Sequence, residues 1–395
     1  MKFIFETFSS SLHRLYQDKY PENSVSLSIF KSVFSSYNIS FYVPKKDTCA
    51  RCDKLNAKLK SSNQEDPLTS QELQFHHQEA SNARQDLKDA EVKCRDPKSR
   101  LLCFTFDLQK TQPIPHINTS VVFYKRQLWL YNLGINNRKK NKGHMFVWEE
   151  SEGKRGANEI GSAILEYLNS LDLSQFDEIH TFSDCCGGQN RNKTIISLMS
   201  HVCQETNIKA WTHTFLESGH SFLPNDTDFG KIEKKKNMRE SIYTSSHWIK
   251  LISDCNFSVH NMKGKFLNLN ELLKTRTFRQ SNSEGEKFNW LKLKWLKMTK
   301  LNPDQMEYRS THDKNSTTKI YDFSSKRNAA NDQPKTLENL YSAPVEISLE
   351  KYNDLMSLLP YVPQIYHQYF IQQPHSKSYK KKPADHPDII EEPEE

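Results

Sequence analysis

The order of apolar patterns between residues 101 and 243 constrains the fold of this chain more than any other feature. Residues 101–107 and 118–135 alternate apolar and polar side chains as β-strands do, and a turn near 125–127 splits the second segment into two strands. Helical and strand patterns then alternate, at 157–171 (helix), 178–184 (strand), 192–206 (helix), 208–217 (strand) and 229–243 (helix). The order βββαβαβα predicts an α/β domain built on one mixed sheet.

This order is typical of the RNase H-like layout, a mixed five-strand sheet with flanking helices whose strand ends collect carboxylates. Asp107 ends the first strand, Asp184 follows the fourth, and Glu233 lies on the helix after the fifth. Two Mg²⁺ or Mn²⁺ ions about 3.5–4 Å apart assist in-line attack on a phosphodiester, and carboxylate oxygens are the ligands that Mg²⁺ prefers. We therefore predict that these three acids are catalytic and hold two divalent ions.

Three blocks, FTFDLQKTQPIP, FSDCCGGQNRNK and GHSFLPNDTDFGKIEK, resemble those of a eukaryotic family of transposase-derived proteins. In that family a Cys/His segment precedes an RNase H-like DDE domain, and the resemblance covers roughly residues 30–300. DTDFGKIE also resembles the SPDLNPIE-type block of mariner-like transposases, whose final Glu is the third metal ligand. This implies the same role for Glu233, with Asp226 and Asp228 as close rivals.

Other interpretations of these blocks stay open. A strand-end Asp is ordinarily solvated or a cap, and the residues after Asp184 suit a plain strand-to-helix turn. Cys185 and Cys186 could be nucleophiles if a helix N-terminus lowered the pKa of either thiol, with His220 as the one candidate partner. His220 itself suits either a contact to the scissile phosphate or a structural hydrogen bond.

A C-x-x-C pair, Cys49 and Cys52, precedes a helical pattern at about 70–92 that carries His76 and His77. Thiolate and imidazole ligands both suit Zn²⁺, and such a pair is the common half of a structural zinc site. One or both histidines would complete the site, with Cys94 also available. The alternative is two ordinary buried thiols.

Charge favours a nucleic-acid partner. The chain carries a formal net charge of +7, and residues 231–300 hold 16 Lys and Arg against 6 Asp and Glu, an excess that attracts phosphates. A solvated basic face is the alternative for the run Lys234, Lys235 and Lys236. No window approaches the roughly 18 apolar residues that a membrane span needs, so we expect DNA as the partner and no membrane; a homo-oligomer stays open.

The expected organisation has five parts: an N-terminal helix and strand (1–46), a Cys/His module (47–98), the RNase H-like DDE domain (99–300), a helical C-terminal extension (301–372) and a disordered charged tail (373–395). We expect a DDE-type polynucleotidyl transferase or nuclease in the nucleus, since the tail carries a KKK run. The alternatives are a domesticated DNA-binding protein without turnover and an interaction scaffold.

Overall fold

The computed structural model describes residues 12–37, 48–61, 66–325 and 336–378. The chain forms two compact units, Met1–Ala50 and Arg51–Glu395. In the first unit residues 12–19 are helical, and a 3₁₀ turn, η1 (Pro21–Asn23), leads to helix α2 (Leu27–Ser36). The strand expected at 39–43 and the basic run at 380–382 lie outside the described residues.

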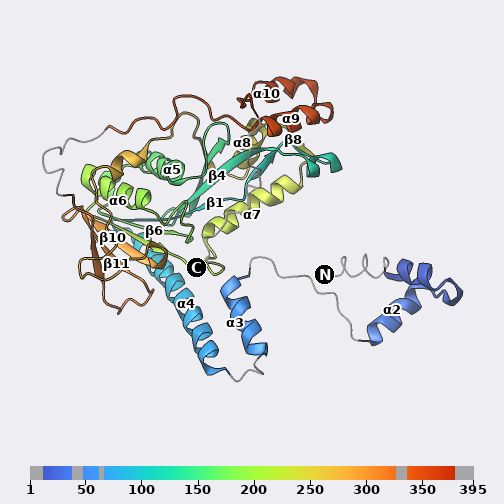
Figure 1. Cartoon of the computed structure of the whole chain (residues 1–395), viewed down its shortest axis with the longest axis horizontal. Coiled ribbons are helices and arrows are strands. Elements are labelled where there is room, and N and C mark those ends of the chain that lie inside the picture. The colour runs from blue at the N-terminus through green and yellow to red at the C-terminus, as the bar shows by residue number, and fades with distance from the viewer. Residues whose placement is uncertain (1–11, 38–47, 62–65, 326–335, 379–395) are drawn as a thin grey trace. The chain divides into compact units, whose positions relative to one another are not determined.

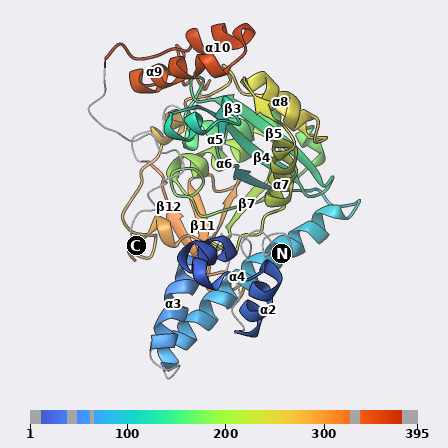
Figure 2. The same cartoon turned by 90° about the vertical axis from the view of Figure 1, so that its right-hand side faces the viewer.

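The second unit begins with a helical pair (Figure 1). Helix α3 (Ala50–Ser61) is followed by the 29-residue helix α4 (Pro67–Arg95), which contains the helix expected at 70–92. Asp66 caps α4 by accepting a hydrogen bond from the Thr69 amide, and Pro67 takes the first helical position, where its missing N–H costs nothing. Figure 2 shows α3 and α4 side by side.

A ten-stranded mixed sheet forms the centre of the second unit. Its nine-strand path runs β12-β11-β10-β7-β6-β1-β4-β5-β9, and β2 pairs with β4 off that path. The strands are β1 (Leu101–Leu108), β2 (Gln112–Ile114), β4 (Leu128–Asn137), β5 (Lys142–Glu149), β6 (Glu178–Ser183), β7 (Ala210–Phe215), β9 (Ser258–Asn261), β10 (Trp295–Thr299), β11 (Gln305–Arg309) and β12 (Lys319–Asp322). The sheet is therefore larger than the five strands expected.

The central five strands, in the order β5-β4-β1-β6-β7, contain both kinds of pairing. β4 is antiparallel to β1 and to β5, whereas β6 is parallel to β1 and to β7. One predicted strand is wrong and one strand was missed. The strand expected just before the turn at 125–127 is replaced by a 3₁₀ turn, η2 (Ser120–Tyr124). The strand expected after that turn is β4, and the unpredicted β5 follows it through a hairpin turn made by the polar residues 138–141.

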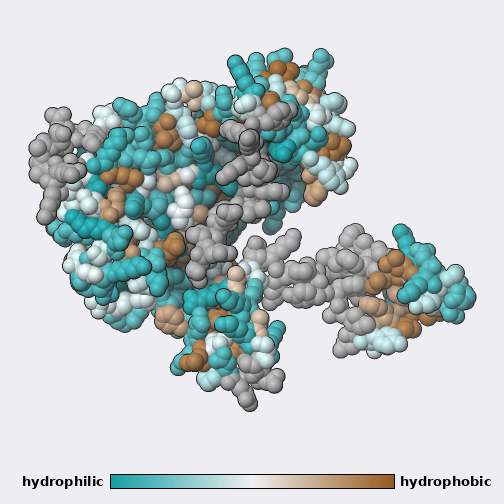
Figure 3. All heavy atoms as spheres, in the orientation of Figure 1, coloured by the Kyte–Doolittle hydropathy of each residue, from teal (hydrophilic) through white to brown (hydrophobic). Residues whose placement is uncertain are grey.

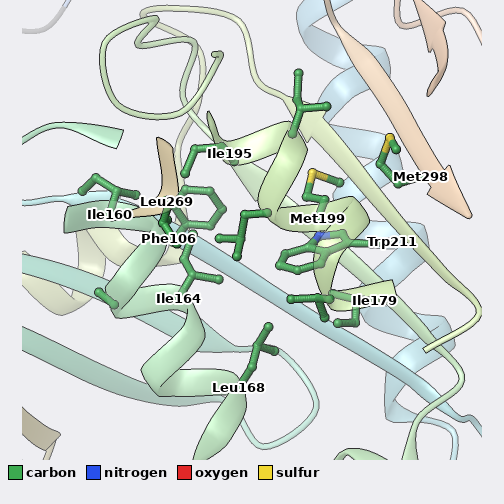
Figure 4. Packing of buried hydrophobic residues seen from close by; sticks show 14 of the residues in the cluster. Phe106, Ile160, Ile164, Leu168, Ile179, Ile195, Met199, Trp211, Leu269 and Met298 are labelled. Atoms are coloured by element: carbon green, nitrogen blue, oxygen red, sulfur yellow. The ribbon is translucent and has the colours of Figure 1, made fainter. Parts of the chain in front are cut away.

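Helices cover both faces of this sheet (Figure 1). On one face, α5 (Ala157–Asn169) and α6 (Lys193–Glu205) pack on the largest apolar cluster. Figure 4 shows Ile160 and Ile164 of α5 and Met199 of α6 meeting Phe106 and Trp211 of the sheet. Both helices fall where the sequence pattern places them.

The opposite face carries α4 and helix α7 (Pro224–Asn237). Ala83 and Leu87 of α4 pack on Cys103 and Phe182, while Ile232 of α7 packs on the far half of the sheet together with α8 (Ser245–Ser253) and α9 (Leu349–Leu358). The remaining elements are short: β3 (His116–Ile117) pairing with β8 (Ser241–Ile242), α10 (His367–Ile371), and the 3₁₀ turns η3 (Leu173–Gln175), η4 (Leu269–Leu273), η5 (Trp290–Lys292), η6 (Leu359–Tyr361) and η7 (Gln364–Tyr366).

The visible face of the second unit is a mosaic of hydrophilic and hydrophobic side chains (Figure 3). Among the residues that the structure describes, no helix combines the length and apolar character that crossing a bilayer requires. The apolar side chains are instead used in the clusters between helices and sheet.

Candidate active site

Asp107 and Asp184 are brought together by the parallel pairing of β1 and β6. The register of this pair runs from Leu101 opposite Glu178 to Thr105 opposite Phe182. Continuing it by two residues sets Asp107 opposite Asp184. Because neighbouring strands lie about 4.8 Å apart and side chains alternate between faces, the two carboxylates leave the sheet side by side, on the face that carries α4 and α7.

The block SDCCGGQNRN folds as the turn between β6 and α6, and this turn holds the Asp184 carboxylate. Asn190 donates its side-chain amide to Asp184 Oδ1, and the Cys186 amide donates to the same oxygen at 3.2 Å. Asn192 then caps α6 by accepting from the Ile195 amide at 3.0 Å. The turn therefore fixes one carboxylate oxygen and starts the next helix.

Asn225 anchors the first turn of α7 to the sheet beside these acids. Its fully buried side chain accepts from the Thr105 hydroxyl at 2.5 Å and donates to the Gly134 carbonyl at 2.7 Å. Gly134 is the cross-strand partner of Asp107. Asp226 is the next residue and is exposed. The two hydrogen bonds of Asn225 therefore hold Asp226 near the end of β1, where Asp107 lies.

The electrostatics of Asp107 show that these three acids are neighbours. Burial, followed by the charges of Asp184 and Asp226, raises the pKa of Asp107 well above its usual range. Like charges at close range disfavour ionisation, so a bound cation would ease the repulsion among these acids. Carboxylate oxygens are the ligands that a hard divalent cation prefers. Among the described residues, these three acids are not one of the groups whose ligand atoms all lie within 4.8 Å of one another, so they would have to close around an ion.

Asp226, and not Glu233, is the acid that the structure places with Asp107 and Asp184. Glu233 lies seven residues further along α7, roughly 10 Å at 1.5 Å per residue. Its carboxylate accepts from Gln112 Nε2 at 3.0 Å and pairs with Lys236. The rise of the helix explains the difference, because only its first turn reaches the strand ends.

Asp228, the second rival, has a structural environment. It is buried, and it accepts from Asn136 Nδ2 at 2.6 Å and from Lys231 Nζ at 3.0 Å. A side chain on Gly143 would lie 2.8 Å from its Oδ2, so this carboxylate fills the space between α7 and the β4–β5 hairpin. These contacts fasten the helix to the sheet.

The Cys and His residues of the N-terminal C-x-x-C segment and of α4 also lie close together, and His220 of the β7–α7 loop joins them. Cys52 Sγ lies 3.3 Å from His77 Nε2 and 3.2 Å from His220 Nε2. One ligand atom each from Cys49, Cys52, His76 and His220 lies within 4.8 Å of the others. Cys94 is instead buried against the sheet with Ala90 and Cys103. Sequence spacing alone could not find His220, which is 168 residues from Cys52.

Thiol chemistry at Cys185 is disfavoured. Cys185 donates its S–H to the Leu216 carbonyl at 2.8 Å, and burial raises the pKa of this thiol to about 11. A thiol at that pKa is almost fully protonated at neutral pH and is a weak nucleophile. His220, the candidate partner, lies in the Cys52 cluster.

Comparison with known proteins gives a weak structural likeness. No protein-family model and no curated protein matches the chain. Among solved structures, the crystal structure of the Mos1 strand transfer complex matches with a TM-score of 0.28 and 11% identity, over 65% of this chain and 87% of that one. A match at this TM-score leaves the assignment of function to the geometry of the site.

Proposed function

We propose that the second unit is an RNase H-like, transposase-derived nuclease or polynucleotidyl transferase of the DDE type, with Asp226 as the third acid. Asp107, Asp184 and Asp226 would hold two Mg²⁺ or Mn²⁺ ions, which when bound activate the attacking oxygen and stabilise the leaving oxygen at a DNA phosphodiester. The nucleus is the compartment that fits such a substrate.

The proposal rests on one observation: three acids from separate elements lie together where the central strands β1 and β6 end. β1 supplies Asp107, the β6–α6 turn supplies Asp184, and the first turn of α7 supplies Asp226. The central strand order β5-β4-β1-β6-β7, with antiparallel pairs on one side of β1 and parallel pairs on the other, is the layout expected of an RNase H-like core. The raised pKa of Asp107, caused by burial and by the charges of Asp184 and Asp226, supports a functional role for this group of acids.

Neighbouring residues of the chain would hold the Asp184 and Asp226 carboxylates in place for this reaction. Asn190 and the Cys186 amide hold one Asp184 oxygen, and the second oxygen would face a cation. The hydrogen bonds of Asn225 hold the start of α7 against β1 and β4, and they thereby fix the position of Asp226 relative to the sheet. An Asp near a helix N-terminus also gains from the helix dipole, which favours its ionised form.

The test compares Asp226→Asn with Glu233→Gln, two variants that each remove one carboxylate charge from the same helix. Mn²⁺ affinity is measured by calorimetry, and Mn²⁺-dependent nicking of labelled duplex DNA is measured in parallel. We expect Asp226→Asn and Asp184→Asn to lose both Mn²⁺ binding and nicking, whereas Glu233→Gln keeps both.

The opposite ranking would restore Glu233 as the third ligand and contradict the Asp226 assignment. Wild-type protein that binds duplex DNA but neither binds Mn²⁺ nor nicks any duplex tried would replace the nuclease with the domesticated DNA-binding protein. Salt-independent or absent DNA binding would leave the interaction scaffold, since phosphate contacts make affinity fall with salt.

A further inference from the structure

We propose that Cys49, Cys52, His76 and His220 bind one Zn²⁺ and that this ion fastens the β7–α7 loop to helices α3 and α4. Tetrahedral zinc with S and N ligands at about 2.3 and 2.0–2.1 Å sets its ligand atoms about 3.6 Å apart. The Cys52 Sγ to His220 Nε2 distance of 3.2 Å is close to that value. Two thiolates and two imidazoles form a closed structural set, with no open position.

His76 is favoured over its neighbour His77 by burial and by a carboxylate behind it. His76 is 3% exposed, whereas His77 is exposed. His76 Nδ1 faces Glu217 Oε2 at 3.9 Å, so Nε2 is the ring nitrogen that would bind the metal. A carboxylate behind a ligating imidazole is the usual arrangement that orients it and raises its basicity.

Glu217 is itself fixed, as such a positioning residue must be. It is buried, it pairs with Lys294, and His312 Nε2 lies 3.3 Å from its Oε1. These contacts hold the Glu217 carboxylate in place behind His76.

The ion would act on the loop that leads into the acid cluster. This loop turns at Gly219, whose φ of 73° suits glycine, and His220 follows directly. Leu216 and Leu223 bury the loop's two ends against α4, but between them Phe222 is exposed, with the Arg84 guanidinium 5.7 Å from its ring. His220 lies six residues before Asp226, so the zinc would restrain the entry to α7.

The test begins with zinc content of the full-length protein purified under reducing conditions without chelator. We expect about one zinc per chain, and Co²⁺ in its place should give the absorption of thiolate-bound tetrahedral cobalt. Cys52→Ser and His220→Gln should lose the metal, and Glu217→Gln, which leaves every ligand in place, should weaken zinc affinity about 10–100-fold. His77→Gln and His201→Gln are the matched controls and should retain it.

Hydrogen exchange then tests the loop. Chelation of the wild-type protein, and His220→Gln without chelator, should each raise amide exchange in residues 217–223 of the loop, while exchange in α5 stays unchanged. Zinc-free wild-type protein, zinc retained by His220→Gln, or unchanged loop exchange on zinc removal would each overturn the proposal. None of these readouts involves DNA or the acid cluster, so their failure is separable from failure of the proposed nuclease.

Discussion

Replacing Asn225 should both destabilise the protein and weaken cation binding at acids that are left intact. The Asn225 side chain is fully buried and makes two hydrogen bonds, with the Thr105 hydroxyl and the Gly134 carbonyl. Each such bond contributes about 1 kcal/mol net, and the Thr105 hydroxyl left without its acceptor costs about 1–2 kcal/mol more. We therefore expect Asn225→Ala to lower the free energy of unfolding by about 3–4 kcal/mol.

A double-mutant cycle isolates the pair. Asn225→Ala, Thr105→Val and the double variant are compared by urea unfolding, followed by tryptophan fluorescence. Because the two side chains are in contact, their interaction energy should lie within the range of about 0.5–3 kcal/mol measured for coupled neighbours. Mn²⁺ affinity should fall in Asn225→Ala, since the first turn of α7 is no longer held against β1 and β4.

Two results would refute this reasoning. A loss below about 0.5 kcal/mol, the level of an ordinary surface change, would mean that α7 is held by its apolar contacts alone. Strict additivity of Asn225→Ala and Thr105→Val would mean that the short Thr105–Asn225 hydrogen bond stabilises nothing.

Three further predictions concern the same region. Asp107→Asn should stabilise the cation-free protein increasingly as pH rises from the ordinary Asp pKa towards the raised pKa of Asp107, because in that pH range the folded wild-type chain keeps a proton that the unfolded chain releases. Urea midpoints of the wild-type and variant proteins at about pH 5 and 8 in EDTA test this prediction. A difference in midpoint that does not change with pH contradicts it. Gly134→Ala should cost about 1–3 kcal/mol by overpacking, since its Cβ would lie 2.7 Å from Phe229 Cε1, whereas Gly188→Ala, with nothing within 4 Å, should be nearly neutral in the same urea assay. Lys234→Ala should reduce the slope of log K against log salt for duplex DNA by about 0.9, the value for one phosphate contact, and more than Lys236→Ala, because Lys236 is paired with Glu233; equal slopes would move the DNA contact elsewhere.

Helix and strand patterns in the middle of the chain were predictable because each element buries one clear face. α5 and α6 place apolar residues every three or four positions against the sheet, and the alternation in β6 marks a strand. The error at 118–124 arose because an apolar run resembles a strand whether or not it is buried. Phe123 and Tyr124 are 86% and 81% exposed, which no periodicity reveals.

The candidate site was predictable only as far as strand ends define it. Asp107 and Asp184 end neighbouring parallel strands, so topology alone brings them together. The third acid depends on where α7 begins, and the pattern placed that start at residue 229 rather than Pro224. The resemblance of DTDFGKIE to the SPDLNPIE-type block favours Glu233, and a helix start five residues late gives no reason to prefer Asp226, which lies in the true first turn.

The contact between Cys52 and His220 links helix α3 to the loop that leads into the acid cluster, so we expect the two candidate metal centres to be coupled. The β7–α7 loop has only eight residues between Phe215 and Pro224. Leu216 and Leu223 at its two ends pack with α4, and His220 in its middle contacts Cys52. Asn225, just after the loop, bonds to Thr105 and Gly134 of the sheet. Only four residues separate His220 from Asn225, so we expect a shift at His220 to be passed on to Asn225. The position of Asp226 therefore depends on two restraints, one in the Cys/His cluster and one at Thr105 and Gly134, and His220→Gln combined with Asn225→Ala should weaken Mn²⁺ binding more than either variant alone.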